Sequence, residues 1–186
     1  MDVLWGEVRP APADHVVAVE DGTVLEVGGL AITAVETPGH ASHHHVYRLD
    51  EVAFTGDAAG ILLPGNHWTD LPAPPPEFDP ERWKNTLARL RGLEVRTLYR
   101  THYGATSNVE EELGAFQEVM EQAVVWIREM IAGGADRDEM IAGFTERMRS
   151  WASRTGTSEE DAIAYELANP REMSVDGISR YLRKRM

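Results

Sequence analysis

Hydrophobic and polar positions follow two different patterns in the two parts of the chain. Up to about residue 102, short apolar runs rich in β-branched and aromatic residues alternate with glycine and proline, which is typical of strands and turns. Gly28–Gly29 and Asp50–Glu51 each separate two such runs, so we expect two β-hairpins. The predicted strands are Thr23–Val27, Leu30–Glu36, His45–Leu49, Val52–Thr55 and Val95–Tyr99.

From about residue 106 onward, apolar residues recur every three or four positions, which predicts amphipathic helices almost throughout. Ser107 with Glu110 forms a sequence pattern typical of a capping box, and Asp136 and Ser158 are predicted to begin two further helices. Asn169–Pro170 precedes a last helix or a turn leading into one. We interpret the apolar stripes as packing surface: Val109, Leu113, Phe116, Met120, Ala123, Ile127 and Met130, then Met140, Phe144, Met148 and Trp151.

Residues 63–83, LPGNHWTDLPAPPPEFDPERW, contain too many prolines to be regular structure over most of their length. Two interpretations stay open. The segment is a linker, or it is a stiff loop that carries Trp68 and forms a wall of a pocket. At its end, Asp79–Pro80 predicts the start of a helix that ends at Gly92.

The composition narrows the range of functions. The 186 residues are 42% hydrophobic and 26% charged, which indicates one globular domain. A net charge of −13 disfavours binding to nucleic acid or to anionic lipid. The chain has no cysteine, so any metal must be held by histidine and carboxylate. No apolar run is long enough to span a membrane and no export signal is recognisable, so we expect a cytoplasmic protein.

Three potential metal ligands each follow a predicted strand. His40 comes after Leu30–Glu36 in Thr37-Pro38-Gly39-His40, Asp57 follows Val52–Thr55, and His102 follows the last strand. If these strands lie in one sheet, their ends converge on one edge, and rigid strand ends are good platforms for ligands. Two imidazoles and a carboxylate suit Zn²⁺ or a similar first-row metal.

The segments TPGHASHH, TGDAAG and RTHYG resemble the third, fourth and fifth motifs of the metallo-β-lactamase fold superfamily. The segments GDAAGILLPG and PAPPPEFD, and the tail MSVDGISRYLRKR, resemble sequences of an uncharacterised bacterial and archaeal subgroup of metallo-hydrolases in that superfamily. The resemblance implies an α/β fold, here mostly one sheet layer of a four-layer αββα sandwich. It implies that residues 1–132 form the C-terminal portion of that domain, with residues 133–186 as a helical extension packed on it.

The resemblance also implies a site. His40 would bind a first metal, His102 a second, and Asp57 would bridge the two, usually zinc. A hydroxide on these metals would attack an ester, thioester or lactone-like substrate. His44 is expected to hydrogen-bond a ligand or line the site, and His67 is a weaker candidate for facing a small-molecule substrate. His43 and His45 are expected to be structural.

The family's first motif, H-x-H-x-D-H, is absent from this sequence. We therefore expect a chain that corresponds to the second half of the fold, with Met1 an internal methionine of a longer relative. Each metal would keep two protein ligands where a catalytic zinc normally has three. Strands without their partner layer would expose apolar faces, which favours a homodimer or recruitment of the missing half.

Three hypotheses follow from these features. The first is a metal-dependent hydrolase. The second is a truncated, non-catalytic chain that acts as a helical association module through residues 107–132 and the helices after them. The third is an iron-dependent redox protein, because histidine and aspartate suit iron as well as zinc.

Overall fold

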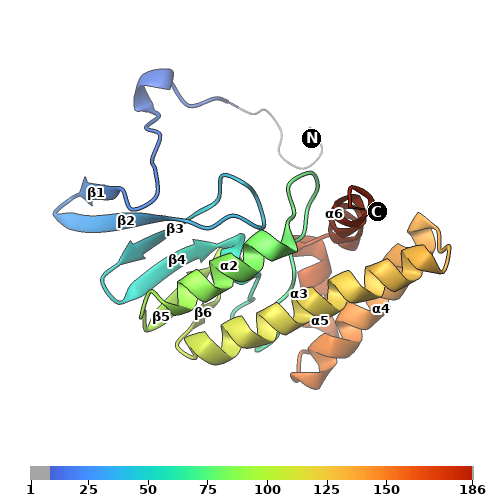
Figure 1. Ribbon diagram of the computed structural model, residues 1–186. Coiled ribbons are helices and arrows are strands. Elements are labelled where there is room, and N and C mark those ends of the chain that lie inside the picture. Colours follow the sequence, from blue (N-terminus) through green and yellow to red (C-terminus); the bar gives the residue numbers. More distant parts are fainter. Residues whose placement is uncertain (1–8, 186) are drawn as a thin grey trace.

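The computed structural model describes residues 9–185 and contains one six-stranded sheet, with its strands in sequence order from β1 to β6 (Figure 1). Neighbouring strands are antiparallel except β4 and β5, which are parallel. As a result β2, β4 and β5 all run in one direction. The strands are β1 (Val24–Val27), β2 (Leu30–Glu36), β3 (His45–Leu49), β4 (Val52–Gly56), β5 (Thr97–Arg100) and β6 (Ala105–Thr106).

Both predicted hairpins are confirmed, with Val27 opposite Leu30 and Leu49 opposite Val52. The last predicted strand is displaced: β5 begins at Thr97 rather than Val95 and continues to Arg100. This difference follows from pairing with β4, because the ladder starts where Val52 meets Thr97. Strand β6 was not predicted, since two residues are too few to show a pattern.

Among residues 9–185, five α-helices follow or interrupt the sheet: α2 (Pro80–Arg91), α3 (Val109–Ala132), α4 (Arg137–Arg154), α5 (Glu159–Ala168) and α6 (Arg171–Arg183). The described part of the chain also has three short 3₁₀ turns: η1 (Ala13–His15), η2 (Asp57–Ala59) and η3 (Thr101–Tyr103). The predicted starts of three α-helices are confirmed by side-chain caps, from Asp79 for α2, Asp136 for α4 and Ser158 for α5.

The predicted capping box at the start of α3 is wrong. The helix begins at Val109, and its N-cap residue, Asn108, makes no side-chain capping hydrogen bond. Thr106 Oγ1 instead accepts a hydrogen bond from the Asn108 N–H. The turn that leaves β6 therefore occupies Ser107, so the helix starts one residue later than the pattern indicated.

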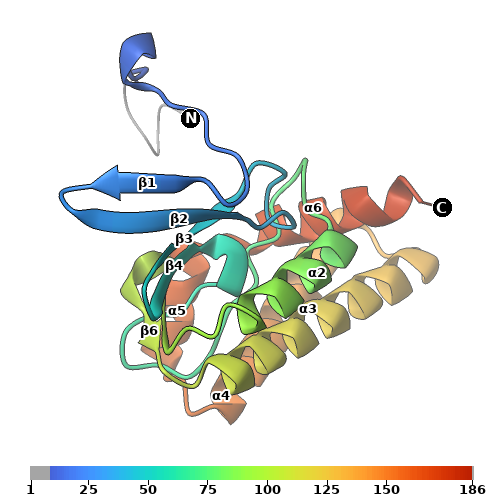
Figure 2. The ribbon, with the colours of Figure 1, turned by 60° about the vertical axis from the view of Figure 1, so that its left-hand side comes forward.

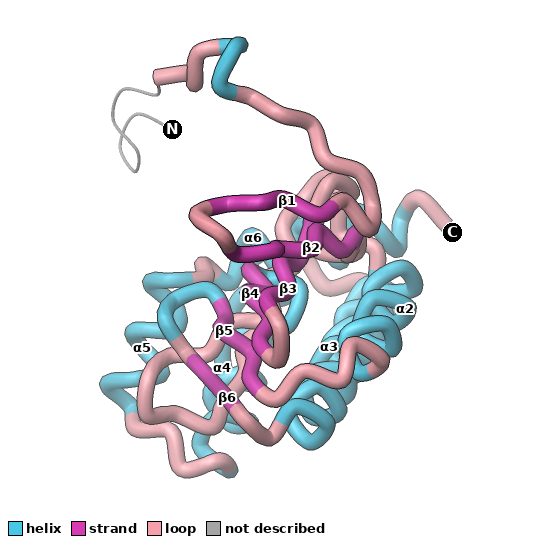
Figure 3. Tube along the Cα trace, turned by 90° about the vertical axis from the view of Figure 1, so that its left-hand side faces the viewer, coloured by secondary structure: helices cyan, strands magenta, loops and turns pink. Residues whose placement is uncertain are grey.

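Helices α2 and α3 lie along one face of the sheet, and α3 in turn contacts α4 and α6 (Figures 2 and 3). Sheet residues such as Val46 and Leu98 share a hydrophobic core with Leu87 of α2 and Leu113 of α3. The apolar stripes predicted from the sequence form this core. Its buried members include Phe116, Met120, Ala123, Ile127, Met140, Phe144, Met148 and Trp151.

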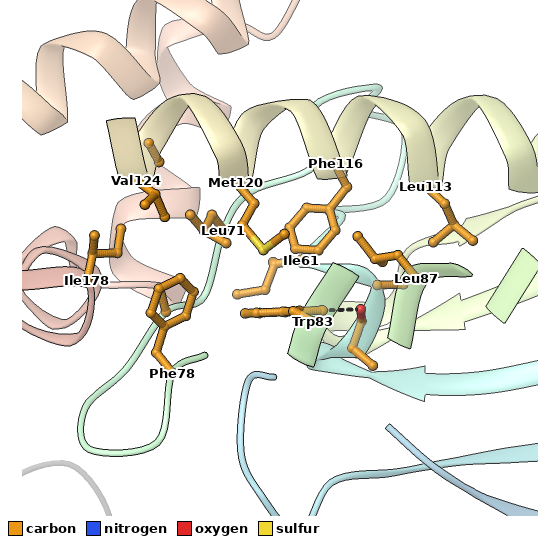
Figure 4. Packing of buried hydrophobic residues seen from close by; sticks show 14 of the residues in the cluster. Ile61, Leu71, Phe78, Trp83, Leu87, Leu113, Phe116, Met120, Val124 and Ile178 are labelled. Atoms are coloured by element: carbon orange, nitrogen blue, oxygen red, sulfur yellow. Dashed lines mark hydrogen bonds between the residues drawn. The ribbon is translucent and has the colours of Figure 1, made fainter. Parts of the chain in front are cut away.

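The proline-rich segment is not a linker, so that interpretation is wrong. Trp68, Leu71 and Phe78 are buried in the core. Figure 4 shows Leu71 and Phe78 beside Met120 and Val124 of α3 and Ile178 of α6. The segment lacks regular structure because of its prolines, yet its apolar side chains fill the space between α3 and α6. The other interpretation of this segment, a stiff loop that carries Trp68 and forms a wall of a pocket, agrees better with its packed position.

The opposite face of the sheet is open. Tyr47, Phe54 and Tyr99 lie side by side in register on β3, β4 and β5, and they are 37%, 45% and 45% exposed. The rings of Phe54 and Tyr99 stack with centroids 5.3 Å apart. An exposed apolar face of this kind is what the sequence predicted for a sheet without a partner layer. Over residues 9–185, no helix is long and apolar enough to cross a membrane.

Candidate metal centre

The three predicted ligands lie beyond the ends of the three strands that share a direction. His40 follows β2 after the turn Thr37–Gly39, Asp57 directly follows β4, and His102 lies in η3 directly after β5. Strands β4 and β5 are paired, so Gly56 and Arg100 are opposite each other at this edge. The topology therefore brings these segments to one edge of the sheet, as the sequence indicated.

His40 and Asp57 are close together. The Nε2 atom of His40 lies 3.4 Å from Oδ2 of Asp57, and the two side chains are 17% and 27% exposed. The Nδ1 atom of His40 lies 2.9 Å from the carbonyl oxygen of Pro72. A carbonyl only accepts hydrogen bonds, so Nδ1 carries the hydrogen and donates it. In the neutral ring, Nε2 then presents a lone pair toward the carboxylate.

This geometry fits two ligands of one metal ion. Two lone-pair donors facing each other need a cation between them, either a proton or a metal. Bonds of about 2.0–2.1 Å at a tetrahedral angle separate two zinc ligands by roughly 3.3 Å, which agrees with the 3.4 Å measured here. A hydrogen bond from the other ring nitrogen to a carbonyl is the usual support of a metal-binding histidine.

His44 lies beside this pair. Its ring is edge-on to that of His40, with centroids 5.9 Å apart. The Thr37 hydroxyl lies 2.9 Å from His44 Nδ1 and 3.3 Å from the His44 carbonyl oxygen, so it holds the ring in place beside His40. Burial, helped by the positive charge of protonated His40, lowers the pKa of His44 to about 4. His44 is thus a neutral imidazole beside His40.

Gly56 makes this arrangement possible. It has a φ of +50°, and a Cβ at this position would lie 2.8 Å from His44 Nε2. A side chain here would therefore displace the His44 ring and strain the backbone in front of Asp57.

The structure does not bring His102 to the pair. His102 has a φ of +64°, and among the described residues no hydrogen bond or ion pair links it to His40 or Asp57. Within residues 9–185, no three histidine, aspartate or glutamate side chains are arranged to hold one metal ion. The predicted donor set therefore fits a metal in part, through two of its three residues.

The other histidines lie elsewhere. His67 is exposed and lines a cavity of about 230 Å³ with Trp68 and Trp151, among other residues that include neither His40 nor Asp57. His43 lies 3.5 Å from Glu77, and His45 Nδ1 lies 3.0 Å from the His43 carbonyl oxygen. The expectation that His67 faces a substrate at the metal centre stays a prediction without support from this arrangement.

Sequence reasoning missed two contributors to the centre. Pro72 acts through its backbone carbonyl, which every residue has, so no sequence signal could have singled it out. Thr37 acts through its hydroxyl and belongs to the TPGH segment that drew attention to His40. Its position in this segment was a signal from which a hydrogen bond between Thr37 and a nearby histidine could have been predicted.

A mixed sheet with one helical layer, and with a histidine and an aspartate paired at the ends of codirectional strands, defines an α/β protein with a candidate metal centre. The family model for the metallo-beta-lactamase superfamily matches residues 2–102. The chain therefore belongs to the metallo-beta-lactamase superfamily, and its fold is a partial form of that superfamily's fold.

Two curated relatives are similar to this chain. Metallo-beta-lactamase fold-containing protein ST1585 of Sulfurisphaera tokodaii is 31% identical over 105 residues, which are 56% of this chain and 39% of the relative. Atrochrysone carboxyl ACP thioesterase of Aspergillus fumigatus is 30% identical over 107 residues, 56% of this chain and 30% of the relative. The chain thus matches less than half the length of either relative.

The chain also aligns with parts of solved structures of metallo-beta-lactamase superfamily proteins. The ST1585 structure aligns with a TM-score of 0.53 and 27% identity, over 66% of this chain and 45% of that one. The metallo-beta-lactamase family protein TTHA1429 of Thermus thermophilus aligns with a TM-score of 0.63 and 21% identity, over 90% of this chain and 48% of that one. The second likeness concerns the fold alone.

Proposed function

We propose that His40 and Asp57 bind a divalent metal ion and that the chain takes part in metal-dependent hydrolysis of an ester, thioester or lactone. The observation that carries the proposal is the 3.4 Å separation of His40 Nε2 and Asp57 Oδ2, with His40 Nδ1 bonded to the Pro72 carbonyl. His102, at the neighbouring strand end, is the proposed ligand of a second ion.

The metal would supply Lewis-acid activation of water and of the substrate carbonyl. The residues of the chain have separate tasks. Asp57 offers a carboxylate with two oxygens, which suits a bridging position, and His40 offers an oriented neutral nitrogen. Zinc is proposed as the resident metal. Iron is kept as the alternative, because imidazole and carboxylate suit both metals.

The proposed substrate class rests on two observations. One similar protein is named as a thioesterase. The net charge of −13 disfavours polyanionic substrates such as nucleic acids. A small neutral or weakly charged carboxylic ester, thioester or lactone is the class that remains.

Two protein ligands are fewer than a catalytic zinc normally has, so further ligands must come from outside the described arrangement. We propose that a second copy of the chain covers the open sheet face and completes the centre. The exposed row of Tyr47, Phe54, Tyr99 and Ala105 crosses four strands without a charged residue, so the negative charges of two copies need not meet there. The same open face favours the second candidate function, a non-catalytic association module.

Metal content of the purified protein tests the proposal. We expect about one zinc or iron per chain by inductively coupled plasma mass spectrometry, and a loss of most of it in His40→Ala and in Asp57→Asn. His15→Ala, on an exposed histidine of η1, is the matched control and should keep the metal. Equal, negligible metal in all four proteins would contradict the proposal and favour the association module.

Hydrolysis assays then separate the substrate classes. The metal-loaded protein is assayed with an aryl ester, an acyl thioester and a lactone, each with His40→Ala as the blank. Oxygen consumption by an iron-loaded sample in place of hydrolysis would support the redox alternative.

A further inference from the structure

The backbone on both sides of Pro72 is held by the C-terminal helical region. Ser174 Oγ donates a hydrogen bond to the Leu71 carbonyl (2.9 Å) and accepts one from the Ala73 N–H (3.2 Å). Asn169 Nδ2 also donates to the Leu71 carbonyl, at 2.9 Å. The peptide units before and after Pro72 are therefore fixed by side chains about 100 positions later in the sequence.

A buried ion pair anchors the same segment one residue earlier. Arg171 Nη1 lies 2.8 and 2.6 Å from the two carboxylate oxygens of Asp70, and Asn169 Nδ2 lies 2.8 Å from Oδ2. The side chains of Arg171 and Asp70 are 6% and 0% exposed. A buried ion pair with further hydrogen bonds has one well-defined geometry, because any displacement leaves a charge unpaired.

Helix α6 can come this close because residue 177 is glycine. A Cβ there would lie 1.9 Å from the Ala73 carbonyl oxygen and 2.9 Å from the Ala73 carbonyl carbon. The contact between α6 and the Leu71–Ala73 backbone is thus built into the sequence of the helix.

We propose that Ser174, Asn169 and Arg171 are positioning residues for His40, acting through the Pro72 carbonyl. They fix this carbonyl, the carbonyl selects the hydrogen-bearing Nδ1 of His40, and the Nε2 lone pair then points at Asp57. The C-terminal helical region is in this way part of the metal centre, although it contributes no ligand. The inference rests on the proposed metal-binding function.

The alternative is that these contacts serve only folding stability. Tyr165→Phe is the matched control, because the Tyr165 hydroxyl donates to the Trp68 carbonyl (2.6 Å) and accepts from the Leu63 N–H (3.0 Å). It anchors the same proline-rich segment from the same region of the chain, but it does not touch Leu71–Ala73.

Long-range ¹H–¹⁵N NMR of the metal-free protein, recorded at alkaline pH so that the ring carries a single hydrogen, reports the tautomer of His40. We expect the Nδ1–H form in the wild type and in Tyr165→Phe, and a mixture with the Nε2–H form in Ser174→Ala and Asn169→Ala. Competition with a chromophoric chelator should show a zinc affinity at least about tenfold lower in these two variants, with little change in Tyr165→Phe.

An unchanged His40 tautomer and zinc affinity in folded Ser174→Ala and Asn169→Ala would overturn the inference. If one variant fails to fold, the other decides. Absence of metal binding in the wild type would instead remove the proposed function, and the tautomer of the metal-free protein would still show whether α6 orients His40.

Discussion

At the scale of single residues, the neutral state of His44 matters most for the candidate centre. Its ring is half-buried beside His40 and hydrogen-bonded to the Thr37 hydroxyl. A charged imidazole there would repel both a protonated His40 and a bound cation. Burial is the main cause that lowers the pKa of His44 to about 4, so the ring is neutral at physiological pH before any metal binds.

This pKa predicts a pH dependence of stability in the metal-free protein. Between pH 6.5 and about 4, His44 takes up a proton in the unfolded chain but not in the folded one. The free energy of unfolding must therefore fall as the pH falls through this window. The contribution is at most about 3 kcal/mol, and less where solvent reaches the ring.

Urea unfolding at pH 7 and pH 4.5, in the presence of a chelator, measures this effect. His44→Gln should lose less stability between the two pH values than the wild type, while His15→Gln should behave like the wild type. Equal losses in all three proteins would show that His44 does not couple to folding.

At the scale of elements, local chemistry predicted helix starts well where the cap is contained in four residues. Asp136 accepts from the Glu139 N–H, and the Glu139 side chain accepts from the Asp136 N–H. Ser107 and Glu110 have the same pattern, but Ser107 lies in the turn after β6 and caps nothing. Pairing with β5 fixes the position of β6, and the turn after β6 then keeps Ser107 out of the helix start.

Two alanine substitutions separate the working cap from the apparent one. Asp136→Ala should lower the free energy of unfolding by about 1 kcal/mol, because it leaves the first turn of α4 without its acceptor. Ser107→Ala should change it by less than about 0.5 kcal/mol. Chemical denaturation measures both. A loss in Ser107→Ala as large as that in Asp136→Ala would mean that Ser107 caps α3 in solution.

At the scale of the whole molecule, helices cover one face of the sheet and leave the other open (Figure 3). The open face carries the register row that includes Tyr47, Phe54 and Tyr99. An apolar row of this kind is typical of an interaction surface in a folded protein. A second copy on this face is the proposed source of the ligands that the centre lacks.

We expect a dimer of the wild-type chain by size-exclusion chromatography with light scattering, and a monomer of the double variant Phe54→Lys/Tyr99→Lys. Two lysines in the row would place charges of one sign against each other across the interface. Leu167→Lys, at a 79% exposed leucine of α5, is the matched control and should stay dimeric. A monomeric wild type, or a double variant that remains dimeric, would contradict the proposed interface.

The sequence by itself determined the two hairpins, the helical stripes, and the arrival of His40 and Asp57 at one sheet edge. The hairpins and stripes depend on short-range periodicity and turn residues, which are visible in neighbouring residues. The meeting of His40 and Asp57 was predicted on the condition that their strands pair in one sheet, as they do. Only the tertiary structure decided the start of β5, the burial of the proline-rich segment and the bonding of His40 to the Pro72 carbonyl. These depend on contacts between residues 32 to about 100 positions apart, where backbone groups and buried side chains meet without any local pattern.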